Sequence, residues 1–254
     1  MKYYGKLLEL GCFSKKDLIH ITGNSPLADW VVAKYLKDGL IERVKKDLYV
    51  AISLESRQPV LNRYAIATRI CEDAVVSYHS AFEFHGIANQ VFYEVQVTSR
   101  TRFCDFEYGD IYYRRMNPCV HGGVMEMNGV RVTTLERTVI DCIHLYEKVG
   151  GLEELLRCLA LIPSLNEKKL VEILEEYQNG YLYQKTGYIL SFFSKELGLS
   201  QSFFSFCRSH LSRAKPYLIK KGLKLVWNKE WRLYAPFDLM EMVNKGVLDY
   251  DAMG

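Results

Sequence analysis

The stretch FSKKDLIHITGNSPLADWVVAKYLKDGLIERVKKDLYVAI, residues 13–52, decides how the first part of this chain folds. Ser14 and Asp17 have the spacing of a capping box, in which each side chain accepts an amide hydrogen that the start of a helix leaves unpaired. This spacing predicts a short helix over residues 15–22. Gly23 and Asn24 follow, and both residue types tolerate the left-handed backbone of a tight turn.

A second helix is predicted from Pro26 to about Lys37, because Ser25 suits the cap and proline is tolerated at the first helical position. Gly39 ends it. Two apolar runs, residues 40–44 and 48–52, then flank three polar residues, which is the spacing of a β-hairpin. Two helices joined by a tight turn and followed by a hairpin predict a winged helix-turn-helix, with the hairpin as the wing.

One face of the second helix is apolar and the other is free to meet DNA, whose major groove accepts such a helix. Residues 1–52 contain nine Lys and Arg against six Asp and Glu. The alternative is a small helical domain that uses solvated lysines for protein contacts. We expect Ser25, Trp30 and Lys34 near base edges and the wing lysines on phosphates. The predicted DNA-binding residues are Lys15, Lys16, Asn24, Ser25, Trp30, Lys34, Lys37, Arg43, Lys45 and Lys46.

The composition of the whole chain is that of an ordinary globular protein, since 49% of its 254 residues are hydrophobic and 25% are charged. Its seven cysteines are scattered and form no C-x-x-C pair, which argues against a disulfide framework and a zinc site. No stretch has the apolar character of a signal peptide or a membrane span, so we expect a soluble, cytoplasmic protein without membrane contact. The polar segment SLESRQP, residues 53–59, predicts a boundary between a DNA-binding domain, residues 1–58, and a C-terminal domain, residues 59–254.

The C-terminal domain is predicted to be mixed α/β, which gives an α+β chain. Residues 59–160 read as a sheet with flanking helices, and Asn128-Gly129 is a strong hairpin signal between two of its strands. Thr133 with Glu136 predicts the start of a helix. Residues 161–254 are predicted to be a helical extension ending in a hairpin. A helix over residues 151–161 leads into this extension. The extension is predicted to contain a helix from Leu165, capped by Ser164, and a helix from Tyr183 to Leu197. Strands over residues 223–227 and 231–234 form its hairpin.

Three groups of side chains resemble chemical sites but have simpler interpretations. Asp105, Glu107 and Asp110 suit a magnesium site, yet carboxylates in a polar turn are more often solvated. His79 and His85 do not share a helical face and have no carboxylate or cysteine at a ligand-like offset, so we expect packed or hydrogen-bonded histidines. Arg137 and Asp141, four residues apart, are expected to pair on the surface of their helix. We therefore predict no metal, no cofactor and no catalytic residues.

Charge is unevenly distributed along the chain. Residues 201–235 contain eight basic residues and one acidic residue, whereas residues 60–160 contain ten basic and thirteen acidic. Aromatic residues alternate with these cations, a mixture that nucleic-acid surfaces use for phosphate neutralisation and stacking. The simpler interpretation is an aromatic core beneath a solvated basic face. Our hypothesis is an antitoxic surface that meets an RNA or the target of a toxin, with candidates Arg208, Arg213, Lys215, Lys220, Lys221 and Lys224.

Five segments in order resemble the AbiEi antitoxins: the N-terminal stretch, SYHSAFEFHGI (residues 77–87), GVRVTTLERTVIDCI (129–143), YQKTGYILSFFSKELG (183–198) and WRLYAP (231–236). The most specific of them is residues 132–141, a hydrophobic residue followed by T-T-x-E-R-T-x-x-D. AbiEi antitoxins belong to type IV abortive-infection toxin-antitoxin systems of phage defence. The chain departs from the family at Asp47, where the wing turn often has glycine.

The resemblance implies a non-enzymatic antitoxin with two activities. Its N-terminal domain would bind inverted repeats of double-stranded DNA in its own promoter and repress the operon. Its C-terminal region would counteract a nucleotidyltransferase-like toxin without forming a stable complex. The residues leave two alternatives: a winged-helix protein with a nuclease-like or nucleotide-processing C-terminal domain, and a ligand-responsive transcriptional regulator. A nucleotidyltransferase itself is disfavoured, because no Gly-Ser turn with paired aspartates is present.

Overall fold

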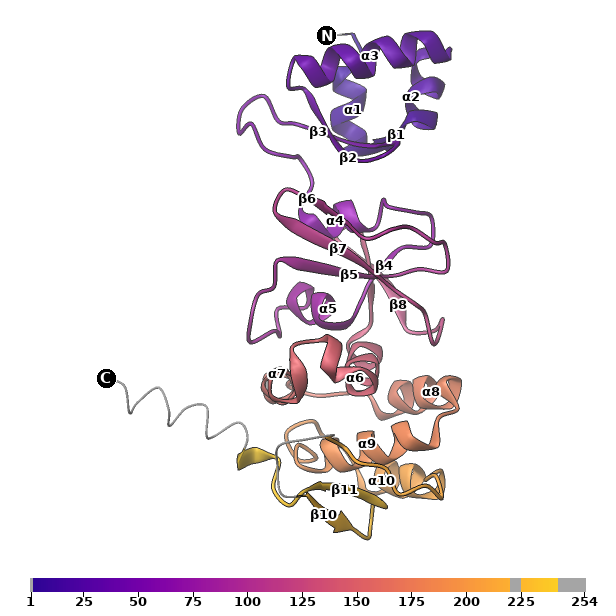
Figure 1. Ribbon diagram of the computed structural model, residues 1–254, viewed down its shortest axis with the longest axis vertical. Helices are drawn as coiled ribbons and strands as arrows, with labels where there is room; N and C mark the ends of the chain where they lie inside the picture. The colour runs from indigo at the N-terminus through magenta and orange to yellow at the C-terminus, as the bar shows by residue number, and fades with distance from the viewer. Residues whose placement is uncertain (1, 220–224, 242–254) are drawn as a thin grey trace, which may run out of the picture. The chain divides into compact units, whose positions relative to one another are not determined.

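The computed structural model describes residues 2–219 and 225–241 and mixes helices with strands, which confirms the α+β class (Figure 1). The chain forms two compact units, each made of several segments. The first unit consists of Met1–Val76, Phe92–Pro118 and Glu126–Val132, and the second of Ser77–Val91, Cys119–Met125 and Thr133–Gly254. The predicted boundary between residues 58 and 59 therefore lies inside the first unit.

The first unit begins with three helices and a small antiparallel sheet. The sheet has the strand order β1-β3-β2. Leu7, Leu18 and Val31, one from each helix, are fully buried and pack with Phe13 and Ile41 of the strands. The elements are α1 (Tyr4–Leu10), β1 (Cys12–Ser14), α2 (Lys15–Thr22), α3 (Ser25–Lys37), β2 (Ile41–Lys45) and β3 (Leu48–Ala51).

The helix starts in this region follow the predicted chemistry with one correction. The capping box of α2 is confirmed, because Ser14 Oγ accepts from the amide of Asp17 at 3.2 Å and the Asp17 carboxylate accepts from the amide of Ser14 at 2.7 Å. The predicted cap of α3, Ser25, is wrong by one residue. Asn24 is the cap, since its side-chain oxygen accepts from the amide of Leu27 at 2.8 Å. Asparagine and serine are equally good caps, so the sequence does not indicate which of the two adjacent residues caps α3.

A six-stranded sheet follows, in the order β6-β7-β5-β4-β9-β8. β5 runs parallel to β7 and antiparallel to β4, and β4 runs parallel to β9. The predicted Asn128-Gly129 turn is confirmed, because both residues have positive φ, 53° and 73°, between β8 and β9. The elements are α4 (Arg63–Ala67), β4 (Val75–Val76), β5 (Glu94–Thr98), β6 (Phe106–Tyr108), β7 (Ile111–Met116), β8 (Val124–Met127) and β9 (Val130–Thr133).

The second unit is mainly helical, with α6 at its centre in contact with α5, α7, α8 and α9. Eight of the ten residues of α6 are buried, so it is enclosed on nearly all sides. Among the described residues, none of the helices has the length and apolar character needed to cross a bilayer. The elements are α5 (Tyr78–Phe84), α6 (Leu135–His144), η1 (Tyr146–Lys148), α7 (Gly151–Ala160), α8 (Glu167–Tyr177), α9 (Gly180–Ser191), α10 (Gln201–Ser209), β10 (Leu225–Asn228) and β11 (Leu233–Pro236).

Three predicted helix starts of this unit are wrong by a few residues. α6 is capped by Thr134 rather than Thr133, and α8 by Asn166 rather than Ser164. α9 begins at Gly180, not Tyr183, because Asn179 accepts from two amides of its first turn. At α6 and α8 a neighbouring capping residue makes the hydrogen bond in place of the predicted one, and at α9 the prediction named no cap. The predicted strand start at Leu223 lies outside the described residues.

Candidate nucleic-acid interface

Helix α3 exposes the face that the sequence predicts. Trp30 is 57% exposed, and Lys34 and Lys37 lie on the same open side with Asp29 and Ala33. The opposite side is buried through Ala28, Val31, Val32 and Tyr35. The exposed Trp30 indole is therefore a large apolar surface that the core does not use.

Two of the predicted DNA-binding lysines are held by acids of the same helix pair. Lys15 Nζ lies 2.6 Å from Asp29 Oδ1, and this hydrogen bond raises the pKa of Lys15. Lys34 Nζ lies 3.1 Å from Asp38 Oδ2, one helical turn further on. Both pairs are solvent-exposed enough to exchange for a phosphate at small cost. Lys16 and Lys37 are exposed as well.

The hairpin β2–β3 presents its basic tip through a turn with an unusual backbone. Asp47 has φ of 61°, in the left-handed region that glycine adopts most easily. The Lys46 side chain is exposed, whereas Lys45 Nζ lies 5.6 Å from the centre of the Phe103 ring and is half-buried. Arg43 lies over Tyr49, with 5.6 Å between guanidinium carbon and ring centre. The two tip lysines therefore differ in how freely they can reach a phosphate.

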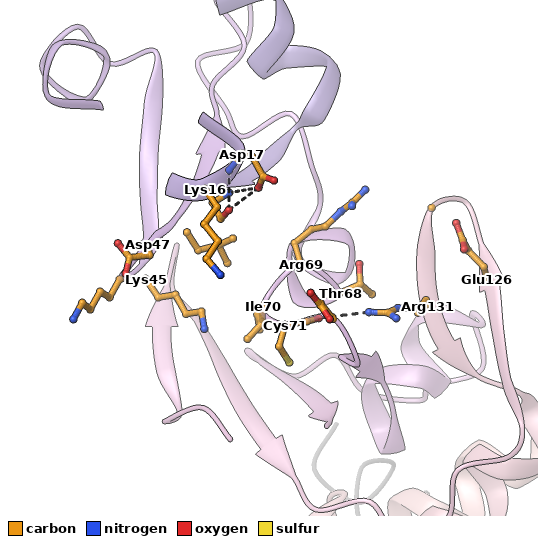
Figure 2. A pocket seen from close by; sticks show the side chains of 15 residues that line it. Lys16, Asp17, Lys45, Asp47, Thr68, Arg69, Ile70, Cys71, Glu126 and Arg131 are labelled. Atoms are coloured by element: carbon orange, nitrogen blue, oxygen red, sulfur yellow. Dashed lines mark hydrogen bonds between the residues drawn. The ribbon is translucent and has the colours of Figure 1, made fainter. Parts of the chain in front are cut away.

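A cleft of about 730 Å³ lies within the first unit beside this tip (Figure 2). Its walls are the start of α2, the hairpin tip, the loop after α4 and the β8–β9 hairpin. Sequence reasoning missed Arg69 and Arg131 here, since neither follows a local motif. Arg131 donates to the backbone oxygen of Cys71 at 3.5 Å. The cleft brings together five cations and four acids, which are Lys16, Lys45, Lys46, Arg69 and Arg131 with Asp17, Asp47, Glu72 and Glu126.

The basic region of residues 201–235 is only partly available for binding, because some of its side chains are paired or buried. Arg208 Nη1 lies 2.6 Å from Glu230 Oε1, and its guanidinium carbon lies 5.6 Å from the Trp231 ring centre. Phe203, Phe204 and Trp231 are each 2% exposed, so these aromatics belong to the core. Arg213 and Lys215 are exposed. Lys220, Lys221 and Lys224 lie outside the described residues.

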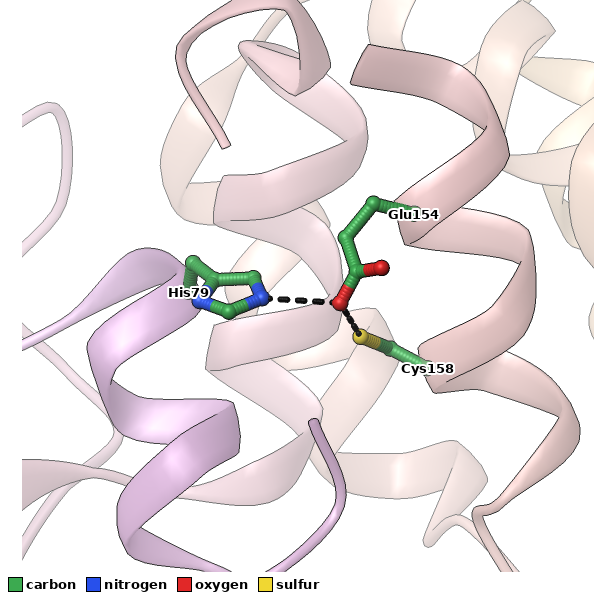
Figure 3. Close-up of side chains that lie close together, drawn as sticks. All are labelled: His79, Glu154 and Cys158. Atoms are coloured by element: carbon green, nitrogen blue, oxygen red, sulfur yellow. Dashed lines mark hydrogen bonds and ion pairs between the residues drawn. The ribbon is translucent and has the colours of Figure 1, made fainter. Parts of the chain in front are cut away.

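His79 takes part in a buried hydrogen-bond network with two carboxylates, and Figure 3 shows its contact with one of them, Glu154. Its Nδ1 lies 3.1 Å from Glu83 Oε1, and its Nε2 lies 2.9 Å from Glu154 Oε1. Burial works against protonation, but these hydrogen bonds raise the pKa of His79. The expectation that no carboxylate sits at a ligand-like offset is wrong, because Glu83 is one helical turn from His79. The expectation of hydrogen-bonded histidines is confirmed, since His85 Nε2 also lies 2.8 Å from the oxygen of Thr133.

The potential metal ligands at this place are already used by protein partners. His79, Glu154 and Cys158 offer atoms within 4.8 Å of one another, the one such group among the described residues. Glu154 accepts from the side chains of Asn89 at 3.1 Å and Cys158 at 3.3 Å and from the amide of Gln90 at 3.0 Å. Burial raises the pKa of the Cys158 thiol to about 12, which disfavours the thiolate that a metal needs. The network joins α5 to α7.

The Arg137–Asp141 pair forms as predicted, but it is buried and not on the surface. Arg137 Nε lies 3.2 Å from Asp141 Oδ2, and the two side chains are 3% and 2% exposed. Arg137 also donates to the oxygen of Gly122 at 2.5 Å, and the Tyr177 hydroxyl donates to Asp141 at 2.5 Å. Burial raises the pKa of Asp141, against the effect of Arg137.

Every polar residue of the segment 132–141 has a structural partner. The hydroxyls of Thr133 and Thr138 lie 2.7 Å apart, Thr134 caps α6, and Glu136 accepts from the amide of Asn166 at 3.2 Å. Two of these residues tie α6 to α8, since Glu136 accepts from the residue that caps α8 and Asp141 accepts from Tyr177. Residues 74–192, which contain this segment, match the family model of the AbiEi antitoxin C-terminal domain. Residues 74–192 are thus similar to the AbiEi antitoxin C-terminal domain, here called the AbiEi domain.

The AbiEi match confirms the resemblance over residues 74–192 and supports an antitoxin role in a toxin-antitoxin system, a role that implies a toxin as partner. The matched domain extends from β4 to the end of α9. None of the curated proteins compared with the chain matches it. The crystal structure of the RV2827C protein from Mycobacterium tuberculosis is similar, with a TM-score of 0.64 and 12% identity, over 93% of this chain and 89% of that chain. At this identity the similarity concerns the fold.

Proposed function

We propose that residues 1–58 are a winged helix-turn-helix that binds double-stranded DNA and represses the operon encoding this antitoxin. The observation that carries the proposal is the exposed face of α3, where Trp30 stands free beside Lys34 and Lys37 while the other face fills the core. A helix of this length, preceded by a tight turn and followed by a basic hairpin, has the arrangement that enters a major groove. The bound sequence is an inverted repeat in the promoter of the operon.

The contacts divide by position. Ser25, Trp30 and Lys34 lie toward base edges, and the hairpin lysines neutralise phosphates without selecting sequence. Of the two, Lys46 is the stronger phosphate contact, because Lys45 is partly withdrawn over Phe103. Asp47 weakens the wing, since its carboxylate would lie next to the DNA backbone.

The AbiEi domain, within residues 59–254, supplies the antitoxic activity. It counteracts a nucleotidyltransferase-like toxin in abortive infection, as a non-enzyme and without a stable complex. This part of the proposal rests on the family match together with the chemistry of the domain: the His79–Glu154–Cys158 group and the Arg137–Asp141 pair are buried and mutually satisfied, so neither is positioned to act on a substrate.

The test is fluorescence-anisotropy binding of the full chain to the duplex upstream of its own gene and to a scrambled duplex, over a series of salt concentrations. Lys46→Ala should weaken binding to both duplexes and reduce the salt slope by about 0.9. Trp30→Ala should instead remove the preference for the promoter duplex. Lys168→Ala on α8 is the matched control, because Lys168 is an equally exposed lysine of the second unit. Equal affinity for both duplexes in the unmodified chain would refute specific repression.

A further inference from the structure

The C-terminal part of the second unit contains a small sheet of three segments. β10 and β11 pair antiparallel with Trp227 opposite Tyr234. On the other side of β11, Tyr217 forms a parallel bridge with Tyr234, supported by backbone hydrogen bonds of 2.8 Å from Leu218 to Tyr234 and from Tyr234 to Pro216. β11 is therefore the central segment, and three aromatic residues face each other across the sheet.

The three rings form a row on one face. The Tyr217 and Tyr234 rings are stacked, with 4.7 Å between centroids and 14° between planes. The Trp227 ring lies on the other side of Tyr234, with 5.1 Å between centroids and 55° between planes, so it is tilted against Tyr234. Tyr217 is 56% exposed and Trp227 is half-buried, whereas Leu218, Leu233 and Ala235 are buried beneath the sheet. The row of rings thus lies on the face of the sheet that does not pack against the core.

Three cations lie close to these rings in the sequence. Lys215 precedes the Tyr217 bridge, and Lys229 and Arg232 lie in the turn between β10 and β11. These cations, with Arg213 and Trp227, line a cleft of about 490 Å³ that has no acid in its lining. Lys215 Nζ lies 5.6 Å from the Trp227 ring centre. Within residues 2–219 and 225–241, none of the four cations forms an ion pair, and the neighbouring acid, Glu230, is occupied by Arg208.

The cleft is built on a fixed support. Gln184 of α9 is fully buried, and its amide nitrogen donates to the oxygen of Arg232 at 2.7 Å and to that of Ala214 at 3.4 Å. One side chain therefore holds both segments that carry the cations. Arg232 has φ of 51°, a conformation that this hydrogen bond helps to maintain. The backbone at Ala214 and Arg232 is thus attached to the buried helix α9.

We propose that this face binds a single-stranded oligonucleotide, with a base stacking on the Trp227 ring in the cleft and the sugar-phosphate backbone following Lys215, Arg232 and Lys229. Aromatic rings beside a basic groove are the two components that single-strand binding without sequence preference requires. The site is separate from the duplex-binding surface proposed for the N-terminal helices and does not depend on it. Its ligand is RNA or single-stranded DNA, which share this chemistry.

The test uses the full chain and fluorescein-labelled oligouridylate and oligothymidylate of about 12 nucleotides, a length within the range that single-strand modules cover. Lys215→Glu with Arg232→Glu should weaken binding at least about tenfold and reduce the salt slope by about 1.4, at roughly 0.7 per phosphate contact. Trp227→Leu should weaken binding about tenfold through lost stacking, while Trp227→Phe should retain most of it. A stronger signal with one of the two oligonucleotides identifies the natural strand.

Lys168→Glu with Lys169→Glu is the matched control, since it changes the net charge equally at exposed positions of α8 outside the cleft. Binding to the promoter duplex, measured in parallel, should survive all the cleft variants, and unchanged thermal midpoints would show that they fold. Equal losses in the control and cleft variants would overturn the proposal, as would undiminished binding in Trp227→Leu. If free uridine monophosphate displaced the labelled oligonucleotide completely, the ligand would be a mononucleotide and the proposal of a bound strand would be wrong.

Discussion

Replacing Arg137 by leucine should be among the most damaging single changes in the AbiEi domain. The substitution leaves the Asp141 carboxylate, 2% exposed, without its guanidinium partner at 3.2 Å, and leaves the oxygen of Gly122 without its donor. Removing one member of a buried pair costs about 3–5 kcal/mol, because the remaining charge stays desolvated. At roughly 2–4 °C per kcal/mol for a chain of this size, the midpoint of unfolding should fall by about 10 °C.

The matched control is Arg157→Leu on α7, which breaks a pair of the same spacing at the surface. Arg157 lies 2.8 Å from Glu153, whose side chain is 49% exposed, and such pairs contribute about 0.5 kcal/mol or less. Adding Asp141→Asn to Arg137→Leu should recover part of the loss, since the amide oxygen still accepts from Tyr177 while the charge is gone. Thermal and urea unfolding measure all three. If Arg137→Leu cost no more than Arg157→Leu, the buried pair would not be a determinant of stability.

The pH dependence of the same variant gives a second check. Burial raises the pKa of Asp141 in the folded protein, and losing Arg137 removes the opposing effect. A buried carboxyl with a raised pKa lowers the unfolding free energy little while it is protonated, and lowers it more as pH rises and the group ionises. The destabilisation by Arg137→Leu should therefore be smaller near pH 5 than near pH 8. The opposite trend would mean that Asp141 is not the source of the cost.

Four further outcomes are expected. Gly187→Ala should destabilise by about 1–3 kcal/mol, because a Cβ there would lie 1.9 Å from the Trp231 ring; an unchanged urea midpoint would contradict this packing. The carboxylates beside His79 raise its pKa against the effect of burial. The stability that His79 contributes is therefore complete below about pH 6.5 and is lost as pH rises through its folded pKa. The unfolding free energy should fall more steeply with pH in the unmodified chain than in His79→Gln. Asn24→Ala should cost about 1 kcal/mol of unfolding free energy through the lost cap of α3, and no measurable cost would mean that another residue caps it. Asp47→Gly should leave stability within about 1 kcal/mol and tighten promoter binding several-fold, since it relieves φ of 61° and removes a carboxylate; weaker binding would place Asp47 away from the DNA backbone.

Local chemistry made the N-terminal elements predictable. Ser14 and Asp17 lie three residues apart and satisfy each other, and the Asn128-Gly129 turn requires only its own backbone. Where two capping residues compete, as at Asn24 and Ser25, the sequence indicates the helix but not its first residue. The short helix α1 and the strand β1 were not anticipated, because their burial depends on packing with the helices and strands that follow them.

Contacts between distant residues could not be predicted in the same way. His79 and Glu154 are 75 positions apart, and only the packing of α5 against α7 brings them to 2.9 Å. Arg208, a residue of the predicted basic surface, pairs with Glu230, which is 22 positions away. Lys229 and Arg232 were not among the predicted surface residues, because they line one cleft with Lys215 only once three separate segments have come together.

The division of the chain into two units limits how this protein can be taken apart. The backbone passes from one unit to the other after residues 76, 91, 118, 125 and 132, so neither unit is a continuous piece. A protease that cuts once between them would release no folded fragment, and a gene fusion at a single junction would exchange no complete unit. The matched segment 74–192 likewise takes part of each unit. The activities of the protein are therefore best separated by point substitutions in the whole chain. Recombination between relatives would have to keep all five points at which the backbone passes between the units.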